Sequence, residues 1–160
     1  MKKIKIETTL YLFDSLDELP QEVSFLMNEA IKARENAYAP YSNFNVGAAV
    51  LLENNEIITG NNQENASYPS GLCAERTAIY YVGSQYPHTK ILRMAISAGS
   101  KNTQTTSPIP PCGACRQAIA EYEVKQGAPI EIYFMGETGK VAKSDSLANL
   151  LPLIFDKSVL

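Results

Sequence analysis

Apolar residues recur along the chain with two different periods, which predict an alternation of helices and strands. A first helix is expected from Pro20 onward, because proline suits the first helical turn. Its apolar residues recur at helical spacing: Val23, Leu26, Met27, Ala30, Ile31 and Ala37. Further helices are expected over about 72–84 and 112–125. A Leu-rich last helix is expected over 146–155, interrupted near Pro152.

Shorter apolar runs predict the strands. The segments 46–52 and 57–60 form an expected hairpin, because Asn54-Asn55 tolerates the positive φ angles of a tight turn. Ile91–Ala98 lacks polar alternation over most of its length, as a buried strand does. Other strands are expected over 130–135, near Val141, and over Lys5–Tyr11. Alternating strands and helices with hairpins at both ends predict an α/β domain with a mixed sheet.

Composition narrows the class of protein. A chain of 160 residues with 45% apolar and 19% charged residues fits one globular domain. The net charge of −3 and the pI of 5.2 give no electrostatic footprint for nucleic acid. The first residues lack the apolar core of a signal peptide, and no run is long enough to span a membrane. We therefore expect a cytoplasmic protein that binds neither nucleic acid nor membrane.

The three cysteines carry the clearest chemical signal. Cys112 and Cys115 are three residues apart at a helix start, so their side chains share one face. Cys73 stands at the start of another predicted helix, where free N–H groups favour thiolate. Three thiolates around one Zn²⁺ leave its fourth position open, as in catalytic zinc sites.

Two charged residues near Cys73 complete the predicted site. Glu75 lies two residues from Cys73 and so does not face the same way on a regular helix. It is better placed beside the metal, where a carboxylate can move protons between water and substrate. Arg76 shares the side of Cys73, and we expect it to hydrogen-bond the thiolates. Arg116, beside Cys115, is a weaker candidate for that role.

Each element of this site also has a simpler interpretation. A lone Cys73 is more often a buried core thiol, and a lone Cys-x-x-Cys can be redox-active. His88 as a fourth ligand would make the zinc structural, but it stands about 20 Å away along the helix. Asn62 and Glu64, two apart, point to one side of an extended chain, yet taken alone they are more often turn residues.

At this point the chain closely resembles the small homotetrameric cytidine deaminases. An acid two residues after one ligand, with Pro-Cys-x-x-Cys downstream, is close to the signature of zinc deaminases. The resemblance covers roughly Val23–Phe155. It rests on the motifs at 39–44 (Ala-Pro-Tyr-Ser-Asn-Phe), 46–49 (Val-Gly-Ala-Ala), 62–68 (Asn-Gln-Glu-Asn-Ala-Ser-Tyr), 73–78 (Cys-Ala-Glu-Arg-Thr-Ala) and 111–117 (Pro-Cys-Gly-Ala-Cys-Arg-Gln).

The resemblance implies a three-layer α/β/α fold with a mixed sheet of about five strands. It implies one zinc per chain on Cys73, Cys112 and Cys115, with Glu75 as proton shuttle. It implies a homotetramer that deaminates cytidine and 2′-deoxycytidine in pyrimidine salvage. Residues 20–160 would form the deaminase domain, and residues 1–19 an N-terminal extension packed on it, adding an edge strand or a tetramer contact.

The resemblance also implies how the nucleoside is held. Asn62 and Glu64 would bind the ribose hydroxyls, Phe44 would pack on the pyrimidine, and the Ala74 backbone would bind the base. Tyr68 would lie near the sugar at a subunit boundary. Phe155 would cover a neighbouring subunit's site, although Leu153-Ile154 stands where the family usually has Gly-Ala.

Three other functions remain possible at this point. A blasticidin-type deaminase shares the zinc motif, but the Asn62/Glu64 pair favours a nucleoside. A polynucleotide deaminase is disfavoured by the low pI and the lack of a basic run. A non-catalytic zinc-stabilised binding module is disfavoured by Glu75 and by the missing fourth protein ligand.

Overall fold

A six-stranded mixed sheet forms the centre of the molecule. The computed structural model describes residues 1–160, except the side chain of Val159. The strands lie in the order β1-β6-β5-β4-β2-β3, and only the β4–β5 pair is parallel. Their bounds are β1 Tyr11–Phe13, β2 Phe44–Leu52, β3 Ile57–Asn61, β4 Ile91–Ser100, β5 Glu131–Met135 and β6 Val141–Ser144. The predicted α/β class with a mixed sheet is confirmed, with one strand more than the expected five.

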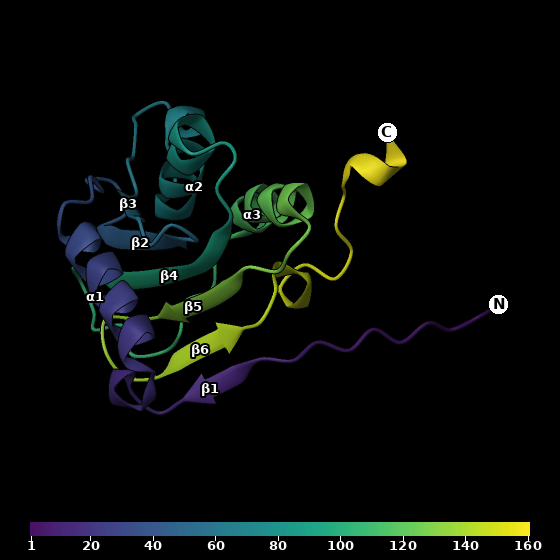
Figure 1. Ribbon diagram of the computed structural model, residues 1–160. Coiled ribbons are helices and arrows are strands. Elements are labelled where there is room, and N and C mark those ends of the chain that lie inside the picture. The colour runs from purple at the N-terminus through teal and green to yellow at the C-terminus, as the bar shows by residue number, and fades with distance from the viewer.

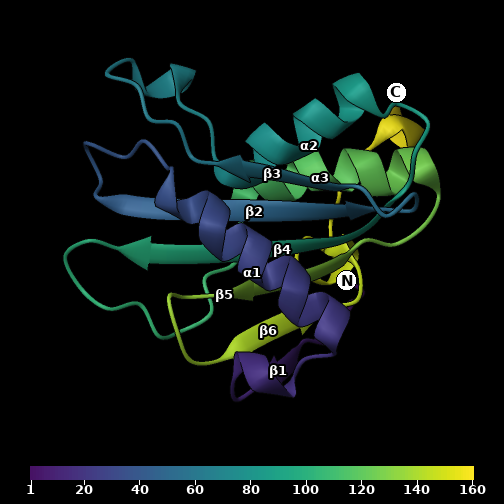
Figure 2. The ribbon, with the colours of Figure 1, turned by 60° about the vertical axis from the view of Figure 1, so that its left-hand side comes forward.

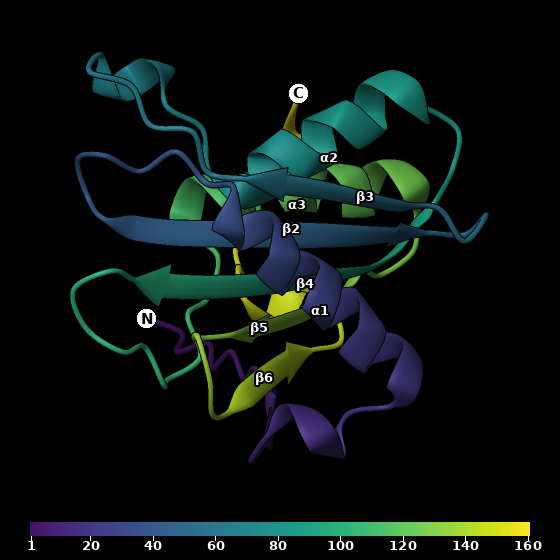
Figure 3. The ribbon, with the colours of Figure 1, turned by 90° about the vertical axis from the view of Figure 1, so that its left-hand side faces the viewer.

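Helices cover both faces of this sheet. Helix α1 (Gln21–Glu35) crosses one face, and α2 (Ala74–Gln85) and α3 (Gly113–Gln126) lie side by side on the other (Figures 1–3). Each interface has its own buried apolar cluster. Leu26 and Met27 belong to the cluster under α1, and Ile79 and Ile119 belong to the cluster under α2 and α3. The predicted three-layer arrangement is therefore present.

Two glycines let the helices approach the sheet closely. A Cβ on Gly47 in β2 would lie 2.0 Å from the carbonyl oxygen of Ala30 in α1. A Cβ on Gly60 in β3 would lie 2.6 Å from the backbone nitrogen of Ala78 in α2. Any side chain at either position would push helix and strand apart. Gly60 thus sets the distance between the sheet and α2. The candidate site lies at the start of this helix.

The predicted C-terminal helix is absent from the described chain, and that expectation was wrong. Residues 146–155 form only a three-residue 3₁₀ turn, Leu147–Asn149, and a second such turn follows at Lys157–Val159. Pro152 lacks the N–H that a helix needs. Side chains of α3 bind the carbonyl groups instead: Arg116 Nη1 donates to Leu150 O at 2.9 Å, and Gln117 Nε2 donates to Phe155 O at 2.8 Å.

The first strand also lies later than expected. The predicted strand covered Lys5–Tyr11, whereas β1 is Tyr11–Phe13. Its partner β6 has only four residues and pairs antiparallel with it, from Tyr11 opposite Lys143 to Phe13 opposite Val141. In this register Leu10 stands opposite Ser144, the last residue of β6, and the residues before Leu10 have no strand beside them in the described chain. Strand propensity alone could not show where the partner strand stops.

No helix in the described part of the chain has both the length and the apolar character that crossing a bilayer requires.

Candidate active site

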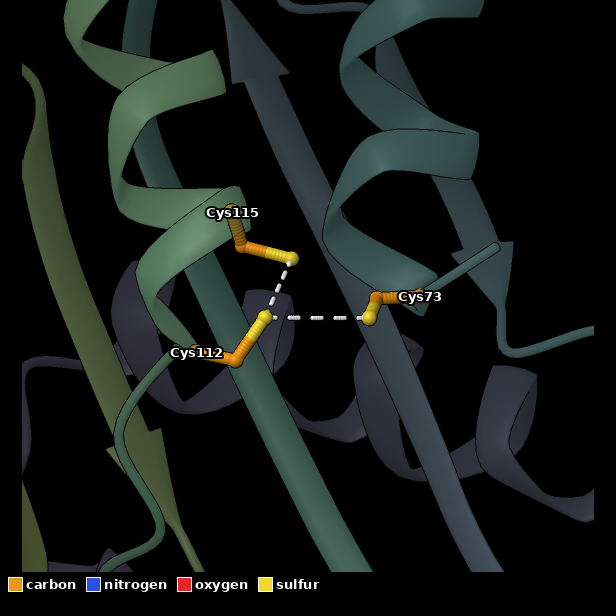
Figure 4. A group of neighbouring side chains, drawn as sticks. All are labelled: Cys73, Cys112 and Cys115. Carbon is orange, nitrogen blue, oxygen red and sulfur yellow. Dashed lines mark hydrogen bonds between the residues drawn. The ribbon is translucent and has the colours of Figure 1, made fainter. Parts of the chain in front are cut away.

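Two helix N-termini meet on one face of the sheet and carry the three cysteines. Cys73 is the N-cap of α2, and Cys112 is the N-cap of α3. Cys115 follows in the first turn of α3 and is completely buried, whereas Cys112 is exposed. The three side chains point toward one another from the two helices (Figure 4). Both helix ends offer free N–H groups and a positive dipole end to negative charge.

The sulfur positions suit a tetrahedral metal. Cys73 Sγ lies 3.9 Å from Cys112 Sγ, and Cys112 Sγ lies 3.5 Å from Cys115 Sγ. All three atoms lie within 4.8 Å of one another. Tetrahedral Zn–S bonds of about 2.3 Å require sulfurs about 3.8 Å apart. Two of the three sulfur pairs have about this spacing and the third lies within 4.8 Å, so the three residues fit a zinc ion.

The electrostatics of the cluster also favour a cation. Hydrogen bonding from Cys115, together with Arg76, lowers the pKa of Cys73 to about 5, so this thiol ionises readily. The negative Cys73 and burial raise the pKa of Cys115 well above its usual value. The side chains alone thus stabilise one thiolate and oppose others. A divalent cation between the sulfurs would supply the positive charge that all three thiolates need.

Arg76 lies against this cluster from α2. Its Nη2 lies 3.5 Å from Cys73 Sγ. Contact with the Cys73 thiolate raises the pKa of Arg76 above its already high value, so it stays charged. Its buried Nε has no hydrogen-bond partner among the described residues. Arg116 points elsewhere, because it donates to the carbonyl oxygens of Pro111 at 2.8 Å and Leu150 at 2.9 Å.

Glu75 is the only buried carboxylate beside the sulfur cluster in the described chain. It is 4% exposed, in the first turn of α2, and its neighbour Ala74 is completely buried. Burial raises the pKa of Glu75, and the Cys73 charge acts in the same direction. The Cys115 side chain and the Arg76 charge oppose that shift. A carboxyl with a raised pKa can both accept and donate protons near neutral pH.

A cavity of about 470 Å³ reaches the cluster at Cys73 and Arg76, whereas Cys112, Cys115 and Glu75 are not among its lining residues. It is lined by Tyr41, Ser42, Asn62, Gln63, Glu64, Asn65, Tyr68, Gly71, Leu72, Cys73 and Arg76. Four of the predicted site residues (Asn62, Glu64, Tyr68 and Cys73) and the predicted neighbour Arg76 thus lie on one cavity. Its volume falls within the usual range for small-molecule sites, about 300–1,000 Å³.

The two predicted ribose-binding residues on the cavity wall, Asn62 and Glu64, are held in different ways. Asn62 bonds the β2 backbone twice: its Oδ1 accepts from Val46 N at 2.7 Å, and its Nδ2 donates to Phe44 O at 2.9 Å. Glu64 Oε2 accepts from the N–H groups of Tyr41 at 2.9 Å and Ser42 at 3.2 Å. The Ser42 hydroxyl and these N–H groups lower the pKa of Glu64, so it is an anion at neutral pH.

The three aromatic residues predicted for the site do not all line the cavity. Tyr68 is 77% exposed at the rim, with its ring edge-on to Tyr41 at 6.1 Å. Phe44 is half-buried at the start of β2 and is not among the residues that line the cavity. Phe155 is 61% exposed, and its carbonyl oxygen accepts a hydrogen bond from Gln117 Nε2.

Sequence reasoning missed the contacts that place the C-terminal segment. Arg116 and Gln117 follow the Cys-x-x-Cys motif and hold residues 150–155 against the start of α3. Arg116 binds Pro111, just before Cys112, and Leu150 at the same time. Nothing in the spacing of these residues signals that contact. Tyr41 also lies on the cavity wall, although its sequence context marks it only as part of the motif at 39–44.

The chain is similar in sequence to known cytidine deaminases. Residues 20–128 match the family model of the cytidine and deoxycytidylate deaminase zinc-binding region. A cytidine deaminase of Sporosarcina psychrophila is 40% identical over 136 residues, which are 85% of this chain and 93% of that protein. One from Halalkalibacterium halodurans is 49% identical over 96 residues, 60% of this chain and 68% of that protein.

A solved structure of a cytidine deaminase also resembles this chain. The crystal structure of cytidine deaminase from Burkholderia pseudomallei aligns with 86% of this chain and 100% of that chain, with 36% identity and a TM-score of 0.70. The matched family region spans the segments that carry Cys73, Glu75, Cys112 and Cys115. The chain therefore belongs to the cytidine deaminase family, whose zinc-binding region it contains.

Proposed function

We propose that this chain is a zinc-dependent enzyme that hydrolyses cytidine and 2′-deoxycytidine to uridine and 2′-deoxyuridine, releasing ammonia, in pyrimidine salvage. The observation that carries the proposal is a buried glutamate beside three converging sulfurs, one of which, that of Cys73, lines a cavity of about 470 Å³. Family membership supports the same reaction.

Cys73, Cys112 and Cys115 would hold one zinc ion per chain. When bound, the zinc activates a water molecule as the nucleophile for C4 of the pyrimidine ring. Arg76 keeps its positive charge against the Cys73 thiolate and so offsets the excess negative charge of three thiolates. The two helix N-termini contribute to the same balance.

Glu75 would move the protons of the reaction. Its carboxylate takes a proton from the attacking water and delivers it to N3 of the ring, which makes C4 more electrophilic. It then carries the second proton, from the hydroxyl group now on C4, to the amino group; the C4–N bond breaks, ammonia leaves and C4 becomes a carbonyl. The raised pKa of Glu75 suits this double role, because a group with a pKa nearer neutrality gives up and regains protons easily.

The cavity would hold the nucleoside by its sugar and its base. The Glu64 carboxylate accepts a hydrogen bond from a ribose hydroxyl, and Asn62, fixed by two backbone bonds, presents its remaining N–H to the sugar. The Ala74 backbone binds the base, and Phe44 packs against it. Tyr68 at the rim lies beside the sugar. Phe155, exposed in a single copy, fits a role over a neighbouring subunit's cavity.

We further propose that residues 20–160 are the deaminase domain, that the enzyme is a cytoplasmic homotetramer, and that its substrate is a free nucleoside. An exposed Tyr68 at the mouth of the cavity and an exposed Phe155 both suit contact with another subunit. The low pI supports a small neutral substrate over a nucleic acid.

An assay of cytidine turnover on purified protein, with zinc measured on the same sample, tests the proposed function. We expect rapid loss of cytidine absorbance with about one zinc per chain. Zinc without cytidine turnover would refute the nucleoside proposal. Turnover of blasticidin S in its place would then favour the antibiotic-inactivating type of deaminase.

Replacement of Glu64 by alanine tests the ribose contact. We expect the KM for cytidine to rise about 10- to 100-fold with a smaller change in kcat, because a charged hydrogen-bond acceptor is lost from ground state and transition state alike. Glu64→Gln is the matched control, since its amide oxygen can still accept from Tyr41 and Ser42. A wild-type KM in Glu64→Ala would remove Glu64 from sugar binding.

Replacement of Arg76 by glutamine tests the charge balance around the zinc. We expect kcat/KM to fall about 10- to 100-fold, as is usual when a residue that supports a metal ligand is lost. Zinc should still bind, because all three thiols remain. Arg76→Lys should recover part of the activity, since it restores the charge without the planar guanidinium. Unchanged kinetics in Arg76→Gln would show that Arg76 only fills space.

A further inference from the structure

The first ten residues form an arm that the candidate site does not use. Residues 1–10, here called the N-terminal arm, contain no helix or strand in the described chain, and all are exposed. The arm leaves the edge strand β1 and projects beyond the body of the molecule (Figure 1). Within the described chain, β1 pairs with β6 on one side only. An open strand edge of this kind offers unpaired backbone groups to another chain.

The arm and β1 share one apolar stripe. Ile4, Ile6, Leu10 and Leu12 all stand at even positions, and they are 79%, 52%, 48% and 59% exposed. In an extended chain, residues two apart lie on the same face. On the odd-numbered face of β1, Phe13 packs against the core under α1, and Lys143 Nζ lies 5.5 Å from the centre of the Tyr11 ring, which is itself 48% exposed. The even-numbered stripe therefore remains as exposed apolar surface along a strand edge.

We propose that this segment pairs with the same segment of a second copy of the chain, as antiparallel strands around a twofold axis at Thr8. Residues directly opposite in an antiparallel pair point to the same face, so even positions must meet even positions. The register centred on Thr8 does this. It places Ile4 opposite Leu12, Ile6 opposite Leu10, and Thr8 opposite the second copy's Thr8.

The backbone of the arm is already turned for this pairing. Thr9 N donates to Asn149 Oδ1 at 3.4 Å, so the Thr9 N–H faces the body of its own chain. Successive residues of a strand direct their backbone groups to opposite edges. Thr8 and Leu10 therefore direct theirs to the open edge, where the register centred on Thr8 needs them.

Charge favours a second copy, in the antiparallel direction, as the partner. The segment begins with Lys2, Lys3 and Lys5, and the acids Asp14, Asp17 and Glu18 follow β1. In the register centred on Thr8, antiparallel pairing lays Lys2 of one copy opposite Asp14 of the other, while Lys5 pairs with Glu7 of its own chain. Parallel pairing would bring like charges together. Asp14 lies 3.1 Å from Lys140 Nζ yet is 78% exposed, so it can accept a second cation.

A disulfide placed on the twofold axis tests this pairing. Opposed Cα atoms in an antiparallel pair are about 4.5–5.5 Å apart, within the range of about 4.4–6.8 Å that a disulfide spans. Thr8→Cys, in the zinc-loaded enzyme with oxidised glutathione, should therefore give a covalent band of two chains. Free thiols are alkylated before a non-reducing denaturing gel. A tetramer held through other surfaces does not produce that band.

Thr9→Cys is the matched control, and the parent chain gives the background from its own cysteines. In the proposed register the two copies' residues 9 are offset by two residues, about 7 Å along the strand, too far for a disulfide. We expect Thr8→Cys to cross-link at least about tenfold faster than Thr9→Cys, because pairing raises the local thiol concentration. Adding Ile6→Asp to Thr8→Cys should abolish that advantage. Equal rates in both variants, or no Thr8→Cys band, would overturn the proposal.

Discussion

Replacement of Glu75 by glutamine is expected to lower kcat for cytidine by about 10²–10⁴-fold or more, the usual contribution of a positioned general acid–base group. Glutamine keeps the shape of the side chain in a site where Glu75 is 4% exposed. It cannot take a proton from water or return one to N3 or to the leaving amine. The loss should appear in kcat more than in KM, because proton transfer belongs to the transition state.

The same variant separates catalysis from folding. Burial already disfavours the charged form of Glu75, so a neutral amide should be tolerated there. We expect an unchanged zinc content and a melting temperature close to that of the wild type. Glu121→Gln, an exposed residue of α3, is the matched control and should behave as wild type. If Glu75→Gln kept a near-normal kcat, Glu75 would not be the proton carrier.

The metal-binding cluster could be predicted because it depends on short spacings at two helix starts. The separation of Cys112 from Cys115 is fixed by one helical turn, and both Cys73 and Cys112 become helix N-caps. The spacing could not show that α2 and α3 lie side by side, with their N-termini next to each other. That arrangement depends on the sheet and on contacts such as Gly60 against α2.

The two ends of the chain were predicted less well, and the reason is tertiary. Residues 146–155 have a helical apolar pattern, but Arg116 and Gln117 bind the carbonyl groups of Leu150 and Phe155 and hold an irregular path. At the other end, strand propensity runs through Lys5–Tyr11, but β6 pairs with this segment only from Tyr11 onward. In both cases a distant element decides between conformations that the local sequence allows.

Asn62 lines the cavity as predicted, and it also makes a contact between strands that the sequence did not predict. Its place two residues before Glu64 predicted a shared side, and both residues line the cavity. The structure adds that Asn62 ties the start of β2 to the end of β3, through Val46 N and Phe44 O. Such a contact between strands depends on their register, which side-chain spacing along one strand does not report.

Replacement of Cys73 by serine is expected to remove zinc and activity together. Cys73 is the one sulfur that α2 contributes, and its Sγ faces Cys112 Sγ at 3.9 Å across the gap between the helices. Without it, α3 offers only two thiols, too few for a catalytic zinc site with three protein ligands. Zinc should fall from about one per chain to below about a tenth, and turnover should fall with it.

Chelated wild-type protein reloaded with zinc is the matched control for this variant. It should regain activity, whereas Cys73→Ser under the same treatment should not. The chain has three cysteines in all, so thiol titration should reveal three reactive groups on zinc removal from the wild type and two in the variant. A redox-active Cys112/Cys115 pair would instead keep its activity in Cys73→Ser and in the chelated protein, because its chemistry needs neither Cys73 nor zinc. A Cys73→Ser enzyme that kept both its zinc and its cytidine turnover would therefore refute the three-cysteine site.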